Sequence, residues 1–161
     1  MEMKEYEGQV FSIEQMQELE AMGIDVSNAS CMWNSIQDKD YKPYKWLPCF
    51  RGEDKEPIEA LRKAFPLTYQ EGNIYYCYTF TDGLKLLPMQ IELPTWETVQ
   101  LIMKPVTFDA KKWRIGYNSY NTVLHSTEGT LTDALFDLIK WCYERGLNSK
   151  NNKLSNREPN E

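Results

Sequence analysis

The sequence predicts an α+β domain, in which a twisted antiparallel β-sheet packs against two main α-helices. Two segments, one near each end of the chain, carry the apolar spacing and the capping residues of helices. Three strand-like runs with short breaks lie just before the second helix. Because such breaks are too short for parallel crossovers, these runs predict an antiparallel meander in the C-terminal half.

The first helix is predicted from the segment FSIEQMQELEAMGI. Ser12 is its expected N-cap, and Gln15 follows three residues later, which is the spacing of a capping box. Gly23 supplies the left-handed residue that ends such a helix. The apolar stripe consists of Ile13, Met16 and Leu19.

Four shorter elements are predicted next, namely strands at 29–36 and 73–80 and helices at 57–65 and 82–87. Pro57 is expected at the first position of one helix, and Thr81 is expected to cap the other. The segment Tyr41–Phe50 is expected at a sheet edge, because Pro43 and Pro48 cannot donate ladder hydrogen bonds.

The meander is predicted from VQLIMKPV, KWRIGYNSY and TVLHSTE. In the middle run, one face carries Trp113, Ile115 and Tyr117 and the other carries Arg114, Gly116 and Asn118. This alternation is typical of a strand that is buried on one side. The second helix is expected at Leu131–Glu144, with Thr130 as N-cap and Gly146 after its end.

Length and composition predict one domain over residues 1–147 and a disordered tail over 148–161, which has one apolar residue in fourteen. The longest apolar runs are too short to span a bilayer, and the N-terminus lacks the apolar core of a signal peptide. We therefore expect a cytoplasmic protein without a membrane contact. Free thiols are then expected at Cys31, Cys49, Cys77 and Cys142.

The net charge and the absence of known motifs argue against several functions. A net charge of −6 argues against binding to duplex nucleic acid, which needs a basic face. The sequence has no phosphate-binding glycine loop and no paired metal ligands, so we expect no cofactor and no metal. The acids of Asp38–Asp40 are interpreted as a charged turn.

His125 is the single histidine of the chain, and it has Ser126, Thr127 and Glu128 beside it. Strand alternation places Val123, His125 and Thr127 on one face and Leu124, Ser126 and Glu128 on the other. His125 and Ser126 therefore cannot form a nucleophile–base pair. We expect a structural histidine and predict no catalytic residue.

The best candidate contact surface lies in Lys39–Arg51, where cations alternate with aromatic rings. Its predicted binding residues are Tyr41, Lys42, Tyr44, Lys45, Trp46 and Phe50. Exposed aromatic rings are common in protein interfaces, so a protein partner or self-association is expected here. The alternative is single-stranded nucleic acid, which also uses rings and cations. A third interpretation is an edge strand whose rings face inward.

Three segments together resemble a family of short proteins encoded in phage and mobile-element regions of gut bacteria. They are FSIEQMQELEAMGIDVSNASCMW, YTFTDGLKLLP and LTDALFDLIKWCYERGL. The resemblance covers most of residues 9–147, and the loop Asp38–Glu56 diverges from it. It implies a shared fold, and because that family carries no assigned activity, it implies no catalytic residue.

These observations favour a small non-enzymatic binding or accessory protein that contacts another protein. A single-stranded nucleic acid module using Lys39–Arg51 is the alternative, and a hydrolase with a carboxylate site is a third possibility.

Overall fold

The computed structural model describes Tyr6 and residues 8–36, 45–69 and 72–155, and it divides into two compact units. Unit 1 is Met1–Thr79 and unit 2 is Phe80–Glu161. Each unit has its own antiparallel sheet and its own helices, which confirms the α+β class. Among the described residues, no helix is both long and apolar enough to cross a membrane.

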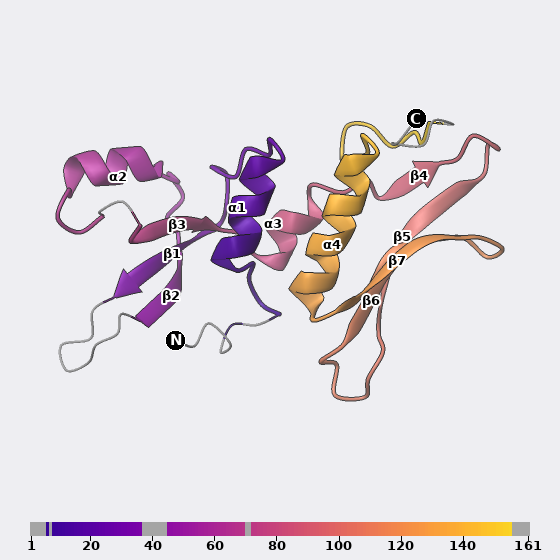
Figure 1. Ribbon diagram of the computed structural model, residues 1–161, viewed down its shortest axis with the longest axis horizontal. Coiled ribbons are helices and arrows are strands. Elements are labelled where there is room, and N and C mark those ends of the chain that lie inside the picture. The colour runs from indigo at the N-terminus through magenta and orange to yellow at the C-terminus, as the bar shows by residue number, and fades with distance from the viewer. Residues whose placement is uncertain (1–5, 7, 37–44, 70–71, 156–161) are drawn as a thin grey trace. The chain divides into compact units, whose positions relative to one another are not determined.

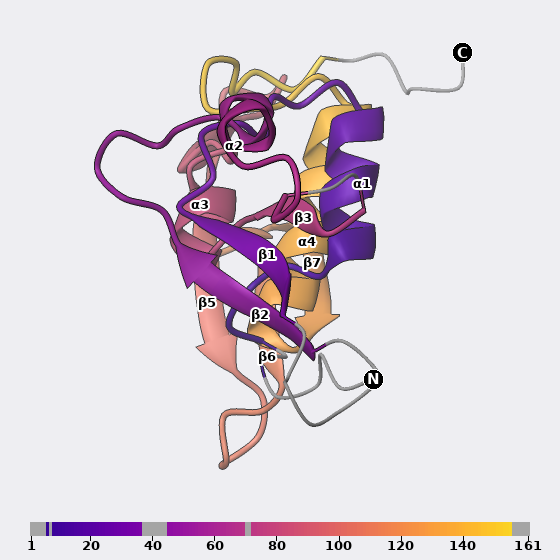
Figure 2. The same cartoon turned by 90° about the vertical axis from the view of Figure 1, so that its left-hand side faces the viewer.

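Unit 1 is built around a three-stranded sheet (Figure 2). Its elements are α1 (Ile13–Ala21), β1 (Cys31–Ile36), β2 (Lys45–Phe50), α2 (Ile58–Ala64) and β3 (Ile74–Cys77). β1 lies between β2 and β3 and is antiparallel to both. For the described part of Tyr41–Phe50, the predicted edge position is confirmed: β2 is an outer strand of this sheet, with Pro48 opposite Trp33.

The caps of α1 have the predicted geometry. The Ser12 hydroxyl accepts a hydrogen bond from the Gln15 N–H at 3.1 Å, and the Gln15 side chain accepts one from the Ser12 N–H at 3.0 Å. Gly23 has a φ of +87°, and the Ile24 N–H donates to the Leu19 carbonyl at 3.1 Å. Local sequence therefore defines both ends of this helix.

The core of unit 1 centres on Trp33, whose ring is buried between strands and α1. Its indole N–H donates to the Phe11 carbonyl at 2.8 Å, so the buried polar atom is satisfied. The surrounding buried cluster consists of Ile13, Cys31, Trp33 and Cys77. On the opposite face of the sheet, the Tyr76 hydroxyl accepts a hydrogen bond from the Ile58 N–H at the start of α2.

Unit 2 contains the predicted meander (Figure 1). Its elements are α3 (Phe80–Leu84), β4 (Gln90–Glu92), β5 (Thr98–Pro105), β6 (Trp113–Asn118), β7 (Val123–Gly129) and α4 (Leu131–Glu144). The strand order is β4-β5-β6-β7, with every neighbouring pair antiparallel. The three-residue β4 was not predicted.

α4 has the predicted bounds and covers one face of the sheet (Figure 1). The Thr130 hydroxyl caps it by accepting from the Asp133 N–H at 3.3 Å, and Gly146 ends it with a φ of +69°. The side chains buried between helix and sheet include Ile115, Tyr117, Leu135, Leu138, Ile139 and Cys142. The other face of β5, β6 and β7 carries mostly exposed side chains.

Two predicted helix starts differ from the structure, one by a single residue and the other by two residues. Pro57 is the N-cap of α2, with extended ψ of 153°, and Ile58 is the first helical residue. Thr81 lies inside α3 and does not cap a helix at 82–87. The chain is extended up to Thr79, which forms an isolated bridge to Val10, and it is helical from Phe80.

The predicted disordered tail differs from the structure over its first half. Asn148 to Ser155 follow a defined path along the edge strand β4. The Glu92 N–H donates to the Asn152 carbonyl at 2.8 Å, and the Leu154 N–H donates to the Glu92 carbonyl at 3.0 Å. Backbone pairing with an open strand edge orders this segment without many apolar side chains. Residues 156–161 lie outside the described chain.

Candidate functional site

The predicted contact segment is only partly placed by the structure. Tyr41, Lys42 and Tyr44 lie outside the described residues, and Lys45 is described by its backbone position at the start of β2. Trp46 is half-buried: its ring packs on the Trp33 cluster and lies 5.7 Å from the Tyr75 ring, measured between centroids. Phe50 is 83% exposed.

Arg51, the last cation of that segment, has a structural role. Its guanidinium donates to the carbonyls of Ser27 and Ala29 on one side and of Lys55 and Glu56 on the other. The group also lies over the Tyr76 ring, 5.1 Å from its centroid. Arg51 therefore joins two loops of unit 1, and its donors are not available to a phosphate.

His125 packs in a stack on the side of the sheet that α4 covers. Its ring lies 4.5 Å from the Trp141 ring with an interplanar angle of 4°, and the Arg145 guanidinium lies 4.4 Å from the same Trp141 ring. Burial lowers the pKa of His125 below its ordinary value, and the nearby Arg145 charge lowers it further. The imidazole is thus held in its neutral form as a packing group.

Ser126 lies on the face opposite His125, as the alternation predicted. Val123 does not share the His125 face, which corrects that part of the prediction. The register shifts between Tyr117–His125 and Asn118–Val123, so Leu124 forms a β-bulge. The extra residue brings Val123 to the Ser126 side of the sheet.

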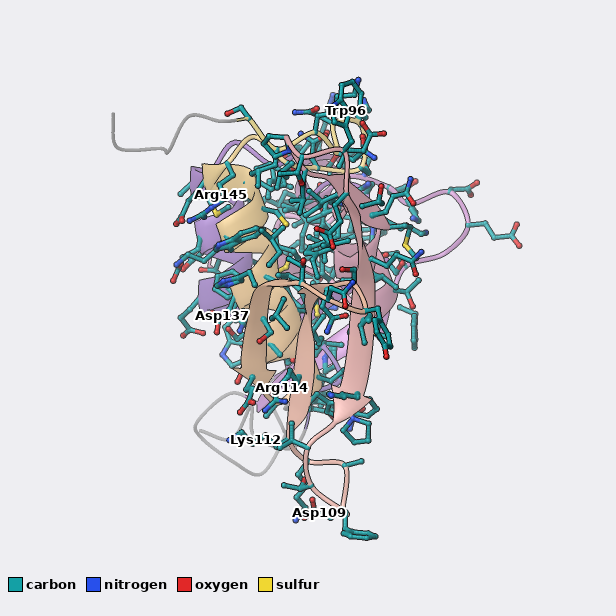
Figure 3. The ribbon with its side chains drawn as sticks, turned by 90° about the vertical axis from the view of Figure 1, so that its right-hand side faces the viewer. Trp96, Asp109, Lys112, Arg114, Asp137 and Arg145 are labelled. Carbon is teal, nitrogen blue, oxygen red and sulfur yellow. The ribbon has the colours of Figure 1, made fainter. Side chains whose placement is uncertain are left out.

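The solvent-facing surface of β5, β6 and β7, here called the open face, is the strongest candidate site (Figure 3). Register places its side chains in three cross-strand rows. The rows are Gln100–Asn118–Val123, then Ile102–Gly116–Ser126, then Lys104–Arg114–Glu128. Along the strands, the first two rows therefore combine polar and apolar residues, and the third row is charged.

A hollow of about 260 Å³ lies over the middle row, where Gly116 has no side chain. A Cβ at Gly116 would lie 2.7 Å from both Cα and Cβ of Ser126, so β6 and β7 approach too closely for any other residue. Ile102 and Val123 border the hollow and are 40% and 71% exposed. The hollow has the size of a docked side chain rather than of an enclosed substrate site.

The charged row has more cations than acids. Glu128 accepts a hydrogen bond from Arg114 Nε at 2.7 Å and forms an ion pair with Lys112 Nζ at 3.2 Å. The hydrogen bonds from Arg114 and then from Lys112 lower the pKa of Glu128. Lys104 forms no ion pair with any described residue, so the row keeps an unneutralised cation.

Two aromatic rings project at the turn end of the open face. Trp96, in the turn between β4 and β5, is 96% exposed and has a φ of +69°; Tyr120, between β6 and β7, is 101% exposed. Glu97 joins the two turns by accepting from the hydroxyls of Ser119 at 2.7 Å and Thr122 at 2.9 Å. Trp96 and Arg114 lie toward opposite ends of this face (Figure 3).

Among the described residues, we find neither an activated cysteine or tyrosine nucleophile nor a cluster of metal ligands. Burial raises the pKa of the Cys142 thiol to about 12 and raises that of the neighbouring Tyr117 hydroxyl as well, so neither is an activated nucleophile. In this part of the chain, no three His, Cys, Asp or Glu side chains gather as metal ligands. The acids Asp38 and Asp40 lie outside it.

Comparison of the chain with protein-family models, curated proteins and solved structures found no match. The candidate site therefore depends on geometry alone. The alternation of Arg114, Gly116 and Asn118 in the sequence was a signal for the open face, but it did not reveal the rows, because cross-strand register was unknown.

Proposed function

We propose that this chain is a small non-enzymatic module that binds another protein through the open face of unit 2. The observation that supports this most is the hollow over Gly116, bordered by exposed Ile102 and Val123. The remaining lining is Gly116 and polar or charged side chains, and a concavity with exposed apolar residues beside polar groups is typical of a contact surface.

The rigidity of the surface also supports binding. Its rows belong to three hydrogen-bonded strands with α4 on their other face, so little ordering entropy is lost when a partner docks. Trp96 and Tyr120 add aromatic contact area on turns that Glu97 holds together.

Single-stranded nucleic acid binding through Lys39–Arg51 is less well supported. Arg51 uses its guanidinium donors on four backbone carbonyls, and the Trp46 ring packs on the core cluster of unit 1. The net charge of −6 also opposes a polynucleotide.

The proposal includes a cytoplasmic setting and an origin in a phage or mobile element. Free thiols at Cys31, Cys49, Cys77 and Cys142 support a reducing compartment. The segments Phe11–Trp33, Tyr78–Pro88 and Leu131–Leu147 carry the resemblance that supports the origin.

The test is capture of proteins from a lysate of the native host, with three variants beside the unaltered chain. Val123→Glu places a charge at the hollow, Leu67→Glu places the same charge on a comparably exposed aliphatic residue of unit 1, and Phe50→Glu probes the Tyr41–Phe50 segment. We expect a protein that is lost with Val123→Glu alone, while the thermal unfolding midpoints of the three variants stay similar.

Titration of the purified captured protein should then give saturable binding that Val123→Glu weakens by about tenfold or more. Loss with Phe50→Glu alone would move the contact surface to Tyr41–Phe50. Equal capture by all four chains would contradict the open face as a binding surface.

A further inference from the structure

We infer that the partner element for the open face is an acidic amphipathic α-helix, which inserts an apolar side chain over Gly116 and places a carboxylate on Lys104. This inference rests on the proposed function and names the class of partner. It depends on three features of the face: its backbone pairing, its row spacing and its charge.

Backbone pairing favours a helix over an extended segment. β6 is paired on both sides, by β5 and β7, so the open face presents side chains and no free ladder groups above that strand. An extended segment lying there would leave its own N–H and C=O groups without protein partners, whereas a helix satisfies them internally. With α4 on the other face, a docked helix would complete a helix–sheet–helix arrangement.

Strand addition at the edge of β7 is a weaker alternative. The bulge at Leu124 interrupts the regular ladder that an added strand needs. Glu128, near the end of that edge, is already engaged by Arg114 and Lys112. Both features are devices that protect strand edges from pairing.

Row spacing fits the repeat of a helix that runs along the strands. The Gly116 row and the Arg114 row are two residues apart, which is about 7 Å along a strand. Residues four apart on one face of a helix are separated by about 6 Å along the axis. A helix with an apolar residue at one position and an acid four residues away therefore reaches both rows together.

The cations at the Lys104–Arg114–Glu128 end of the face favour an acidic residue in the partner helix. At this end of the face, Glu128 pairs with Arg114 and Lys112, and Asp109 pairs with Lys111 in the adjoining turn, so Lys104 adds a cation without a partner among the described residues. An acidic helix is thus attracted to this end of the face. Because Lys104 forms no ion pair with a described residue, a partner carboxylate there displaces no existing pair.

The experiment selects a partner without presupposing its sequence. A displayed library of helical peptides about 14 residues long, long enough to cross the three rows, is randomised on one face and selected on the immobilised full chain. We expect enriched peptides to combine an apolar residue with Asp or Glu four positions away. The same peptides, synthesised and labelled, are then titrated by fluorescence anisotropy.

Variants of the full chain locate the contact. Lys104→Glu should weaken the enriched peptides by about tenfold or more, and Lys85→Glu, an exposed lysine of unit 2 outside the face, should change their affinity by less than about twofold. A peptide with Lys in place of its acid should regain affinity for Lys104→Glu. Val123→Glu should also weaken binding, because it borders the hollow.

The inference would be overturned by no enrichment over the starting library, by enrichment without acids, or by peptides that bind as strands by circular dichroism. Enriched peptides that Val123→Glu blocks but Lys104→Glu does not would remove the acidic helix and leave protein binding by the open face in place. Absence of any host protein in the capture experiment above would instead remove the proposed function.

Discussion

Arg51 holds two loops of unit 1 together through backbone carbonyls that are distant in sequence. It contacts Ser27 and Ala29 on one loop and Lys55 and Glu56 on the other. Hydrogen bonds with a charged donor contribute more than neutral ones, and the carbonyls would lose their partners on truncation. This side chain is therefore expected to contribute measurably to folding.

Arg51→Met should lower the free energy of unfolding by about 1–3 kcal/mol in urea titrations. Arg51→Lys should recover little of this loss, because one ammonium group cannot reproduce a planar fork that reaches both loops. Lys104→Met, at an exposed lysine without an ion pair in the described chain, serves as the control and should stay within about 0.5 kcal/mol. Equal stability of the two methionine variants would show that the loops hold without the guanidinium.

Because of His125, the free energy of unfolding should decrease as the pH falls. Its pKa in the folded chain is lowered by burial and then by Arg145, while the unfolded chain has the ordinary value of 6.5. The unfolded chain therefore binds the proton more readily, so the stability from neutral His125 is present above pH 6.5 and is lost as pH falls below it.

Urea unfolding at pH 7.5 and pH 5.5 measures this effect, with His125→Gln as the comparison. The unaltered chain should lose more stability between the two pH values than the variant does, because this is the single histidine and acids titrate mostly lower. An identical loss in both proteins would mean that the stack with Trp141 does not disfavour the imidazolium.

Of these two residues, the sequence predicted the orientation of His125 but not the role of Arg51. The period of a strand was enough to separate His125 from Ser126, because both follow the bulge at Leu124 and side chains alternate along a regular stretch of strand. The role of Arg51 was not accessible, since its carbonyl partners at Ser27 and Ala29 are brought near only when β1 pairs with β2. A cation beside aromatic rings fits both a phosphate contact and a loop clamp.

At the scale of elements, the sequence predicted the helix ends that depend on neighbouring residues. The capping box of α1 and the bounds of α4 depend on residues within one or two turns, and both are confirmed. The short β4 was missed because its order comes from pairing with β5 and from the segment 148–155. The bulge at Leu124 was missed because it depends on the facing strand β6.

The pairing of β6 with β7 makes Gly116 an obligatory glycine. Gly116→Ala should cost about 1–3 kcal/mol, because the added Cβ would lie 2.7 Å from Cα and Cβ of Ser126 and push the strands apart. Gly52→Ala is the matched control, since nothing lies within 4 Å of its added Cβ, and it should stay within about 0.5 kcal/mol. Chemical denaturation of the two variants gives the comparison, and similar losses would mean that the two strands can separate at little cost.

For the whole molecule, composition and length predicted one domain, whereas the backbone contacts divide the chain at Thr79. Composition cannot distinguish these cases, because two small cores and one larger core need similar amounts of apolar residues. The secondary-structure pattern does not distinguish them either, since strands and helices alternate through both halves.

Unit 2 has the features of a segment that folds by itself. Its meander and α4 enclose a buried set that includes Ile91, Val99, Ile115, Leu135, Leu138 and Ile139, all 0% exposed. The segment 148–155 pairs with β4 and protects that edge of the sheet. A closed core with a paired edge is what an independent antiparallel domain requires.

A fragment of residues 80–155 is therefore expected to show dispersed amide resonances and one cooperative thermal transition. Ending the fragment at residue 147 should lower its midpoint by several degrees, because Glu92 then loses both backbone partners. The two fragments test separate questions: whether unit 2 folds without unit 1, and whether the segment 148–155 stabilises its sheet. If 80–155 is unfolded while the full chain melts in one transition with equal calorimetric and van't Hoff enthalpies, the two units fold as the single domain that the sequence predicted. If both fragments fold equally well, the pairing of the tail with β4 contributes nothing to the stability of the sheet.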